Sequence, residues 1–593
     1  MKNKFSWKIA GEAGDGILNA GMMFARMCVR SGLNVFATAE YPSLIRGGHN
    51  HLDVMVDEEP LFSHTKYVDV LVALNKESVE KHAHKISQDG GIIYDGDKTQ
   101  FDRNDIRDDI KMFPIPLLKI ADQNGGKIMR NVVAMGATVA LIDFDIEIFN
   151  HVIRDNFGAK KGEVVANANI TAAKAGYDYI KQNFSGFKYR LSARKKKNVI
   201  FLSGNEAIAA GAIKAGCKFL AAYPMTPATS VMTNMAAQEK NYNIVVKHTE
   251  DEIAAINMAI GASYAGVRSM VCTSGGGFCL MTEGLGLAAQ TEVPLVIVEA
   301  QRPGPGTGMA THSGQGDLRF VLHASTDESP RVIIAPGDQT ECFYLTAEAF
   351  NIAEKYQMPV IILTDKYLAE SYKSVPVFNT SNISIERGKL LEEKDFGDDF
   401  KRYRVTEDGV SPRSIPSQKG GEHTASSYEH DEEGYEREEE GIRIKMHNKR
   451  HRKFENLKKE LPLPALRGDD DADITIISWG STKGPVLQAM KKLSQKGIKT
   501  NFCHIVYLSP FPEESIAEII MGSKHIVVIE NNKTSQLSGI IKELTEVDVD
   551  YKILKYDGRP FYPEEIVRGI KDILENSDAK EIVFSRNLIV EAK

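Results

Sequence analysis

Short, largely apolar runs without regular apolar–polar alternation recur along this chain, and they limit the folds it can adopt more than any other feature. Examples are VDVLVAL at residues 68–74, PLVIVEA at residues 294–300 and PVIILTD at residues 359–365. A half-exposed strand alternates apolar and polar side chains, so unalternating runs predict strands that are covered on both faces. Because segments of helical composition separate the runs, we expect an α/β protein built from several doubly wound open-sheet domains.

Shifts in composition divide the chain into four predicted parts. Residues 1–194 begin with a strand, a glycine loop, a helix ended by Gly32 and a second strand, which is the order expected of a parallel sheet. Residues 195–375 follow a basic stretch and open with a strand at residues 198–202. Residues 376–470 carry runs of opposite charge, which predicts a solvated connector with some helix; the alternative is an ordered arm that packs on a partner subunit. Residues 471–593 return to α/β patterning with DITIISWGS.

Charge and composition exclude several classes of protein. A net charge of −7 at pH 7 argues against a nucleic-acid or membrane-surface binder. We find no apolar run of about 18 residues, so we expect no membrane span, and the basic start lacks the apolar core of a signal peptide. The six cysteines are scattered without a CxxC pair, which predicts a cytoplasmic protein and argues against an iron–sulfur cluster held by this chain.

A glycine loop, GEAGDGI at residues 11–17, lies between the first predicted strand and helix. Its backbone N–H groups could hold a diphosphate at the helix N-terminus, which makes Gly11, Gly14 and Gly16 candidate cofactor-binding residues. The alternative is a tight turn that any doubly wound sheet requires, and the sequence does not separate the two. The triplet GDG also occurs in the magnesium–diphosphate signature of thiamin enzymes, but the paired asparagine of that signature is absent here. We therefore expect no metal site of that kind on this chain.

Two prolines interrupt the segment AAYPMTPATS at residues 221–230. Thr226 before Pro227 is a favourable start for a helix, because Thr caps well and Pro suits the first helical position. The carboxyl end of a strand in an open α/β sheet is also where ligands bind, and a rigid turn there would fix a hydroxyl beside the crevice. Tyr223, Pro224 and Thr226 are therefore candidate site residues.

Glu252 opens a long apolar stretch, EIAAINMAIGASYAG. Thr249 and Glu252 have the T-x-x-E spacing of a capping box, which is the structural interpretation. The apolar helix that follows predicts a carboxylate largely removed from water. A buried glutamate of this kind is what thiamin chemistry needs, since it hydrogen-bonds the aminopyrimidine ring of the cofactor. Glu252 is therefore a candidate catalytic residue.

Two further loops follow predicted strands. In TSGGGF, Ser274, Gly275 and Gly276 let backbone approach a flat ligand closely. In QRPGPGTGMATHSGQGDL, Arg302 leaves the end of a strand and Thr311 lies in the same loop. Arginine is a natural clamp for a carboxylate, so Arg302 and Thr311, together with Thr226, are candidate substrate-binding residues.

The stretch HNH places His49 and His51 on one side of a predicted strand. Two imidazoles two residues apart can bind a metal, but a polar strand edge is the simpler explanation, and we favour the polar edge.

Together these motifs are similar to those of the 2-oxoacid:ferredoxin oxidoreductase α subunit, in the form with a fused N-terminal γ domain. YPMTP resembles the family's YPITP turn, with Met225 in place of Ile, and the blocks around TSGGGF and VEAQRPGPGTGMATHSGQGDL resemble its thiamin and substrate loops. GEAGDGI and AEYPSLIRGGHNHLDVMV resemble the γ domain. GVSPRSIP and SSYEHDEEG in the connector resemble members assigned to 2-oxoglutarate.

The resemblance implies a fold, a reaction and roles for particular residues. The parts become a γ-type domain (1–194), a thiamin pyrimidine-binding domain (195–375), a connector (376–470) and a transketolase C-terminal-like domain (471–593). Glu252 faces the aminopyrimidine ring, Thr226 lies near cofactor and substrate, and Arg302 and Thr311 recognise the oxoacid carboxylate. The reaction converts a 2-oxoacid and coenzyme A to an acyl-CoA, CO2 and reduced ferredoxin.

The resemblance also implies partners. Thiamin diphosphate is shared with a β subunit that carries Mg²⁺ and a [4Fe–4S] cluster, ferredoxin accepts the electrons, and the assembly is (αβ)₂. Pyruvate or a branched-chain oxoacid remains an alternative substrate, and a non-catalytic nucleotide-binding assembly subunit remains an alternative function. A diacid substrate needs a second cationic contact, for which Arg319 and His312 are the candidates.

Overall fold

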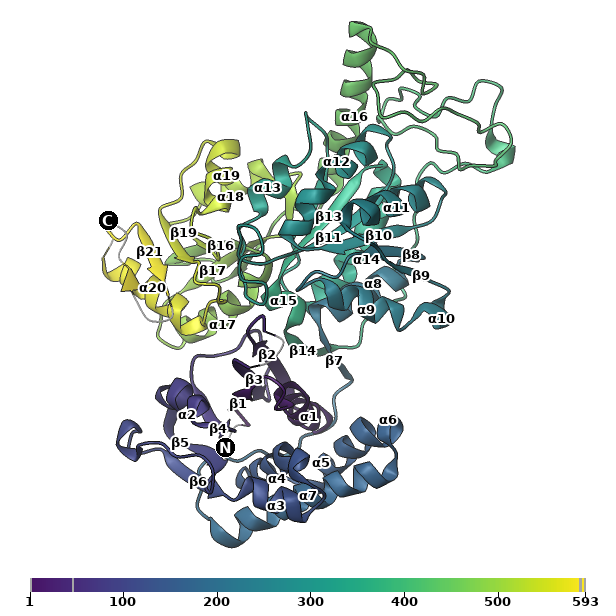
Figure 1. Ribbon diagram of the computed structural model, residues 1–593. Coiled ribbons are helices and arrows are strands. Elements are labelled where there is room, and N and C mark those ends of the chain that lie inside the picture. The colour runs from purple at the N-terminus through teal and green to yellow at the C-terminus, as the bar shows by residue number, and fades with distance from the viewer. Residues whose placement is uncertain (1–2, 45–46, 577, 586–588, 591–593) are drawn as a thin grey trace. The chain divides into compact units, whose positions relative to one another are not determined.

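The computed structural model describes residues 3–44, 47–576, 578–585 and 589–590, and the chain forms two compact units (Figure 1). Their bounds are Met1–Leu202 with Glu370–Val377 and Tyr562–Glu564 for the first, and Ser203–Ala369, Phe378–Phe561 and Glu565–Lys593 for the second. Ile45 and Arg46, in the segment that resembles the γ domain, lie outside the described residues. Within the described ranges, no helix combines the length and apolarity needed to span a bilayer.

The first unit is built on an eight-stranded mixed sheet in the order β6-β5-β4-β1-β3-β2-β14-β7. Its strands are β1 (Phe5–Glu12), β2 (Asn34–Glu40), β3 (His49–Asp57), β4 (Val68–Ala73), β5 (Ile86–Asp95), β6 (Lys111–Ile115), β7 (Val199–Ser203) and β14 (Tyr372–Pro376). Its helices are α1 (Ile17–Arg30), α2 (Lys76–His82), α3 (Leu117–Gln123), α4 (Arg130–Leu141), α5 (Ile146–Ile153), α6 (Ala159–Lys161) and α7 (Glu163–Asn183).

Helix α1 shows how local sequence specifies this unit. Ile17, Ala20 and Phe24 recur at helical spacing and are buried in the core, where Phe24 packs on Trp7 of β1 at 4.6 Å between ring centroids. Gly32, at φ 79°, follows the helix in a left-handed conformation, so the predicted helix end is confirmed.

Two expectations for this unit were wrong. β1 and β2 were expected to be neighbours in a parallel sheet, but β3 lies antiparallel between them, with His51 opposite both Ala10 and Glu40. β7 was expected to open the second part, but it joins β14 at the edge of the first sheet. Both differences depend on strand pairings between distant segments, which local patterns do not encode.

The second unit contains two seven-stranded sheets. The first has the order β18-β12-β13-β11-β10-β8-β9, and its strands are β8 (Phe219–Ala222), β9 (Val245–His248), β10 (Ser269–Thr273), β11 (Leu295–Gln301), β12 (Val332–Ile334), β13 (Pro359–Asp365) and β18 (Tyr507–Ser509). Its helices are α8 (Gly204–Lys214), α9 (Thr229–Ala236), α10 (Glu239–Tyr242), α11 (Glu252–Tyr264), α12 (Gly275–Gln290), α13 (Leu318–His323), α14 (Gln339–Tyr356) and α15 (Lys366–Glu370). Figure 1 shows α11 to α13 on one side of these strands and α8, α9 and α14 on the other.

The second sheet of this unit has the order β15-β17-β16-β19-β20-β21-β22. Its strands are β15 (Leu466–Gly468), β16 (Ile474–Trp479), β17 (Thr500–Ile505), β19 (Ile526–Glu530), β20 (Tyr551–Lys555), β21 (Glu581–Phe584) and β22 (Ile589–Val590), with helices α17 (Lys483–Ser494), α18 (Glu513–Met521), α19 (Gln536–Thr545) and α20 (Pro563–Glu575). One core joins the two sheets: Ile297 of β11 and Phe278 of α12 belong to the same buried cluster as Trp479 of β16.

The connector is ordered in part by a buried charge cluster, which corrects the expectation of a solvated segment. Its helix α16 (Glu440–Glu460) carries Lys449 and Lys453, whose Nζ atoms lie 2.6 and 2.9 Å from the two carboxylate oxygens of Glu292. All three side chains are buried. The charge pattern was therefore interpreted wrongly. Lys449 and Lys453 do not need water to stabilise their charges, because Glu292, which follows α12, pairs with both of them.

Candidate functional site

The candidate residues of the second unit gather at one edge of its first sheet. β11, β10, β8 and β9 are parallel neighbours, so their carboxyl ends lie side by side. Tyr223, Pro224 and Thr226 follow β8, Glu252 follows β9, Ser274, Gly275 and Gly276 follow β10, and Arg302 follows β11. The tertiary structure thus brings four separate sequence motifs to the edge where open α/β sheets bind ligands.

Glu252 is the first residue of α11 and only 3% exposed. The predicted capping box is wrong: Asp251 caps the helix by accepting a hydrogen bond from the Ala254 N–H at 2.7 Å, and the Thr249 hydroxyl donates to the Asp251 carbonyl. Asp251 stands directly before the helix, so its short side chain reaches the free N–H groups first. The carboxylate of Glu252 is consequently not used in capping.

The carboxylate of Glu252 lies beside the first turn of α12. A Cβ atom added to Gly277 would be 2.6 Å from Glu252 Oε1 and 2.1 Å from Thr273 Oγ1, so a larger residue there would require these side chains to move. Among the described residues, Glu252 Oε1 and Ser274 Oγ are buried without a hydrogen-bond partner. Buried polar atoms are normally paired, so this edge is built to receive a polar ligand.

Thr226 and Arg302 are joined directly. The Arg302 Nη1 group donates a 2.8 Å hydrogen bond to the Thr226 carbonyl, while Arg302 Nε is buried without a partner in the described chain. Thr226 does not cap a helix, and Pro227 is not its first residue, because α9 begins at Thr229. The Asn205 side-chain amide donates a 2.8 Å hydrogen bond to the Pro227 carbonyl. A side chain, rather than a helical hydrogen bond, therefore pairs this backbone carbonyl. The two prolines therefore shape a loop after β8 that Arg302 anchors to the end of β11, two strands away in the sheet.

Thr311 is buried in the loop that follows Arg302, with its hydroxyl 3.2 Å from His312 Nδ1. The loop is fastened to the second sheet, since the Gln315 N–H donates to the Asn531 carbonyl at 2.8 Å. Arg319, proposed as a second cationic contact, instead pairs with Glu543 of α19 at 3.2 Å. Only His312 of the two cationic candidates lies beside a predicted substrate residue.

Three carboxyl groups near this edge were not identified from the sequence: Glu299 and Asp365 are buried, and Asp317 is half-buried. Burial raises the pKa of Asp317 and of Asp365 to about 6, and burial followed by the charges of those two residues raises the pKa of Glu299 well above its usual range. A Cβ on Gly275 would be 2.5 Å from Asp317 Oδ2, so Asp317 borders the glycine turn. The available signal was a glutamate within the apolar run PLVIVEA.

The glycine loop belongs to the first unit, and the Asp15 side chain of the loop hydrogen-bonds to the loop's own backbone. The Asp15 carboxylate accepts a hydrogen bond from the Glu12 N–H at 3.0 Å and pairs with Arg130 at 2.8 Å. The Ala13 N–H donates to the Gly48 carbonyl. This arrangement favours the tight-turn interpretation, and ligand binding by Gly11, Gly14 and Gly16 stays a prediction.

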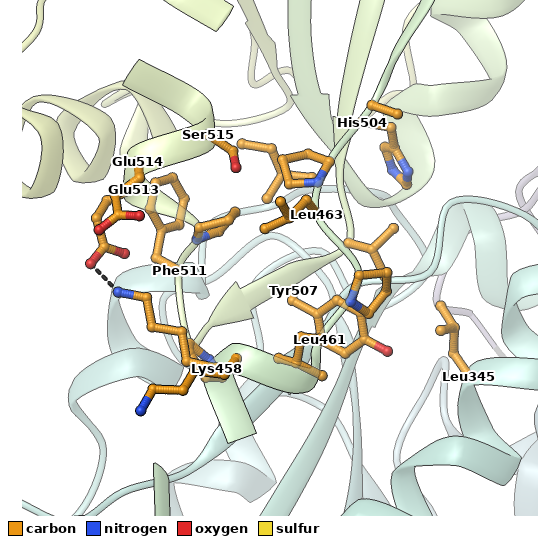
Figure 2. Close-up of a pocket in the computed structure, with 18 of the residues that line it drawn as sticks. Leu345, Lys458, Leu461, Leu463, His504, Tyr507, Phe511, Glu513, Glu514 and Ser515 are labelled. Carbon is orange, nitrogen blue, oxygen red and sulfur yellow. Dashed lines mark hydrogen bonds and ion pairs between the residues drawn. The ribbon is translucent and has the colours of Figure 1, made fainter. Parts of the chain in front are cut away.

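A separate pocket of about 690 Å³ lies between α14, the segment after α16, and the β17–α18 connection (Figure 2). Leu461, Leu463, Tyr507 and Phe511 give it an apolar lining, and Lys458 pairs with Glu513 at its edge. None of the site residues predicted from the sequence lines this pocket. It is therefore distinct from the strand-end site.

Comparison with known proteins gives the same assignment as the motifs. The chain is 32% identical over 639 residues to the 2-oxoacid:ferredoxin oxidoreductase subunit alpha of Saccharolobus solfataricus, covering 98% of this chain and 99% of the relative. The chain belongs to the 2-oxoacid:ferredoxin oxidoreductase family. The family description "Pyruvate flavodoxin/ferredoxin oxidoreductase, thiamine diP-bdg" matches residues 210–449, "Pyruvate ferredoxin/flavodoxin oxidoreductase" matches residues 6–179, and "Pyruvate:ferredoxin oxidoreductase core domain II" matches residues 472–566.

Two other members of the 2-oxoacid:ferredoxin oxidoreductase family bear on substrate. The 2-oxoglutarate oxidoreductase subunit KorA of Mycobacterium tuberculosis is 28% identical over 606 residues, covering 96% of this chain and 91% of its own. The solved 2-oxoglutarate:ferredoxin oxidoreductase of Magnetococcus marinus, with 2-oxoglutarate, coenzyme A and succinyl-CoA bound, matches with a TM-score of 0.91 and 34% identity, covering 96% of this chain and 100% of that chain. The predicted α/β fold class and oxidoreductase class are thereby confirmed.

Proposed function

We propose that this chain is the catalytic α subunit, with a γ-type region fused ahead of it, of an enzyme that oxidatively decarboxylates 2-oxoglutarate. The products are an acyl-CoA, CO2 and reduced ferredoxin. The observation that carries the proposal is the buried, unpartnered Oε1 of Glu252 at the strand-end edge. The similarity to a 2-oxoglutarate enzyme over nearly the full chain supports the choice of substrate.

Thiamin diphosphate, when bound, supplies the nucleophilic carbon that attacks the keto group of the oxoacid. The residues at this edge fit the pyrimidine half of that cofactor, because Glu252 offers a carboxylate oxygen and Ser274 a hydroxyl, both buried without partners in the described chain. Glu252 would hold a proton or hydrogen bond at a ring nitrogen in a site that water does not reach. Gly277 has no side chain that would push this carboxylate out of position.

Arg302 is proposed to bind the oxoacid carboxylate. Its Nη1 group is fixed by the Thr226 carbonyl, which orients the guanidinium and leaves Nε available. A charge-assisted hydrogen bond to a carboxylate is stronger than a neutral one, so this contact would position the substrate. Thr311, buried in the same loop, is the proposed second contact.

The cofactor is proposed to be completed by a β subunit that carries Mg²⁺ and a [4Fe–4S] cluster, in an (αβ)₂ assembly. Apolar side chains on the same elements as the site are exposed, which is typical of a surface that a partner covers. They are Tyr223, Val245, Ile253, Met258, Leu280 and Met309. Ile253 and Met258 show that the mostly apolar helix α11 carries exposed as well as buried side chains. Coenzyme A handling is assigned to the γ-type region.

The test is to combine the chain with its β partner and measure coenzyme A-dependent dye reduction with 2-oxoglutarate, pyruvate and a branched-chain oxoacid. We expect 2-oxoglutarate to be preferred, and Glu252→Gln to lose turnover while the complex still assembles. A variant that keeps wild-type turnover would refute the role of Glu252. Reduction with none of the three acids would favour the non-catalytic alternative.

A further inference from the structure

A third histidine joins the HNH pair of the first unit. His49 and His51 lie on one face of β3, as residues two apart on a strand must, and His82 at the end of α2 lies against both. The ring centroid of His82 is 4.9 Å from that of each strand histidine. Sequence analysis could not have found this triad, because His82 is far along the chain from the other two.

The nitrogen atoms of the triad are close enough to share one ion. His49 Nε2 and His82 Nε2 are 2.8 Å apart, and one ligand atom from each of the three residues lies within 4.8 Å of the others. Nitrogens around a tetrahedral ion with bonds of about 2.0–2.1 Å are separated by roughly 3.3 Å, a spacing that small ring rotations provide from these positions.

The triad also leaves polar atoms unpaired in the protein interior. Nδ1 of all three imidazoles is buried without a hydrogen-bond partner in the part of the chain described. His51 and His82 are 5% and 0% exposed, whereas His49 is half-buried and opens toward solvent. Whichever nitrogen carries the proton in the His49–His82 contact, a buried nitrogen without a partner in the described chain remains in this cluster.

The surroundings resemble the outer shell of a metal site. His51 Nε2 lies 3.4 Å from Asp53 Oδ2 and 4.0 Å from Glu40 Oε2, and a carboxylate that accepts from a ligating histidine orients the ring. The Lys8 ammonium is balanced by Asp53 at 2.8 Å.

We propose that His49, His51 and His82 bind a divalent transition-metal ion, for which Zn²⁺ has the best-matched ligand preference. Three imidazoles are a known ligand set for zinc and leave a fourth position for water or an exchangeable ligand. This site belongs to the first unit, whereas the thiamin edge belongs to the second, and the proposal does not depend on the proposed function. It replaces the polar-edge interpretation of His49 and His51.

The chain contains an internal control. Glu328, His447 and His451 form another grouping of potential ligands in the second unit, but Glu328 is exposed, with 81% of its side-chain surface accessible. Zinc bound by Glu328, His447 and His451 would be held at the protein surface and not by the buried triad. The variant His447→Ala therefore separates the two sources.

The experiment treats the full chain with a chelator, reloads it with Zn²⁺ or Co²⁺, removes excess ion by gel filtration and measures bound metal and the Co²⁺ absorption bands. We expect a single tightly held ion with a tetrahedral cobalt spectrum. In His49→Ala and His82→Ala the dissociation constant should rise by more than the ~10–100-fold that loss of an outer-shell partner causes. His447→Ala should leave binding unchanged.

Three results would overturn the proposal: no ion retained by the wild type, equal retention in His49→Ala, or loss of binding in His447→Ala. His49 is half-buried, so its truncation disturbs packing less than that of His82 and decides the matter if His82→Ala does not fold. Far-ultraviolet circular dichroism of each variant checks that the first unit remains folded.

Discussion

Substituting Gly277 by alanine tests the geometry of the thiamin edge without touching a proposed catalytic side chain. The added Cβ would lie 2.1 Å from Thr273 Oγ1, 2.6 Å from Glu252 Oε1 and 2.8 Å from Glu252 Cγ. The contacts are to side-chain atoms, so rotation of Thr273 and Glu252 can relieve them while the backbone stays in place. The carboxylate is then displaced from its position.

The expected losses of stability and of turnover in Gly277→Ala follow from this displacement of the Glu252 carboxylate. Overpacking of this kind costs about 1–3 kcal/mol, and we expect the lower end because the three nearest atoms all belong to side chains. Loss of a positioned acid–base group costs about 10²–10⁴-fold in turnover. Activity should therefore fall far more than stability.

Gly261→Ala is the matched control. Gly261 lies in α11, the helix that begins with Glu252, and an added Cβ meets nothing within 4 Å. Replacing a helical glycine by alanine should stabilise the chain by about 0.5–1 kcal/mol without moving the carboxylate.

The assay measures oxoacid-dependent dye reduction by each variant with the β partner, alongside urea unfolding of the chain. Gly277→Ala with wild-type turnover and a normal unfolding midpoint would show that Glu252 is not constrained as described. Equal losses of activity in both variants would indicate a general sensitivity of these helices instead.

Three other substitutions test separate features. Glu292→Gln leaves the buried Lys449 and Lys453 without their counter-charge, so urea unfolding should show a loss of about 3–5 kcal/mol, and an unchanged midpoint would contradict the buried cluster. The folded-state pKa of Asp317 is about 6, above its usual 3.8, so the folded state binds this proton more tightly than the unfolded state does. The free energy of unfolding should therefore fall by about 3 kcal/mol as the pH rises from about 4 to about 6. Asp317→Asn should remove that portion of the pH dependence, and a variant with the full wild-type slope would argue against it. Arg302→Ala should raise KM for 2-oxoglutarate about 10–100-fold with a smaller effect on kcat, as steady-state kinetics will measure; an unaltered KM would exclude the carboxylate contact.

Much of the fold and part of the site could be predicted from local patterns. The apolar runs located β4, β11 and β13, Thr226 and Arg302 were identified because each follows a strand, and Glu252 was identified because it opens an apolar stretch. The position of a residue relative to its own strand is a local property, so one sequence is sufficient to infer it.

The sequence by itself determined the α/β class and the residues that stand at strand ends, because side-chain patterning sets which segments can be buried as strands. Only the tertiary structure decided which strands are neighbours, that Asp251 rather than Thr249 caps α11, and that Gly277 lies over Glu252. It also brought His82 to His49 and placed Glu292 between two lysines of α16. Apart from the local Asp251 cap, these contacts join residues that are distant in the chain, and their energies depend on burial and geometry that exist only after folding.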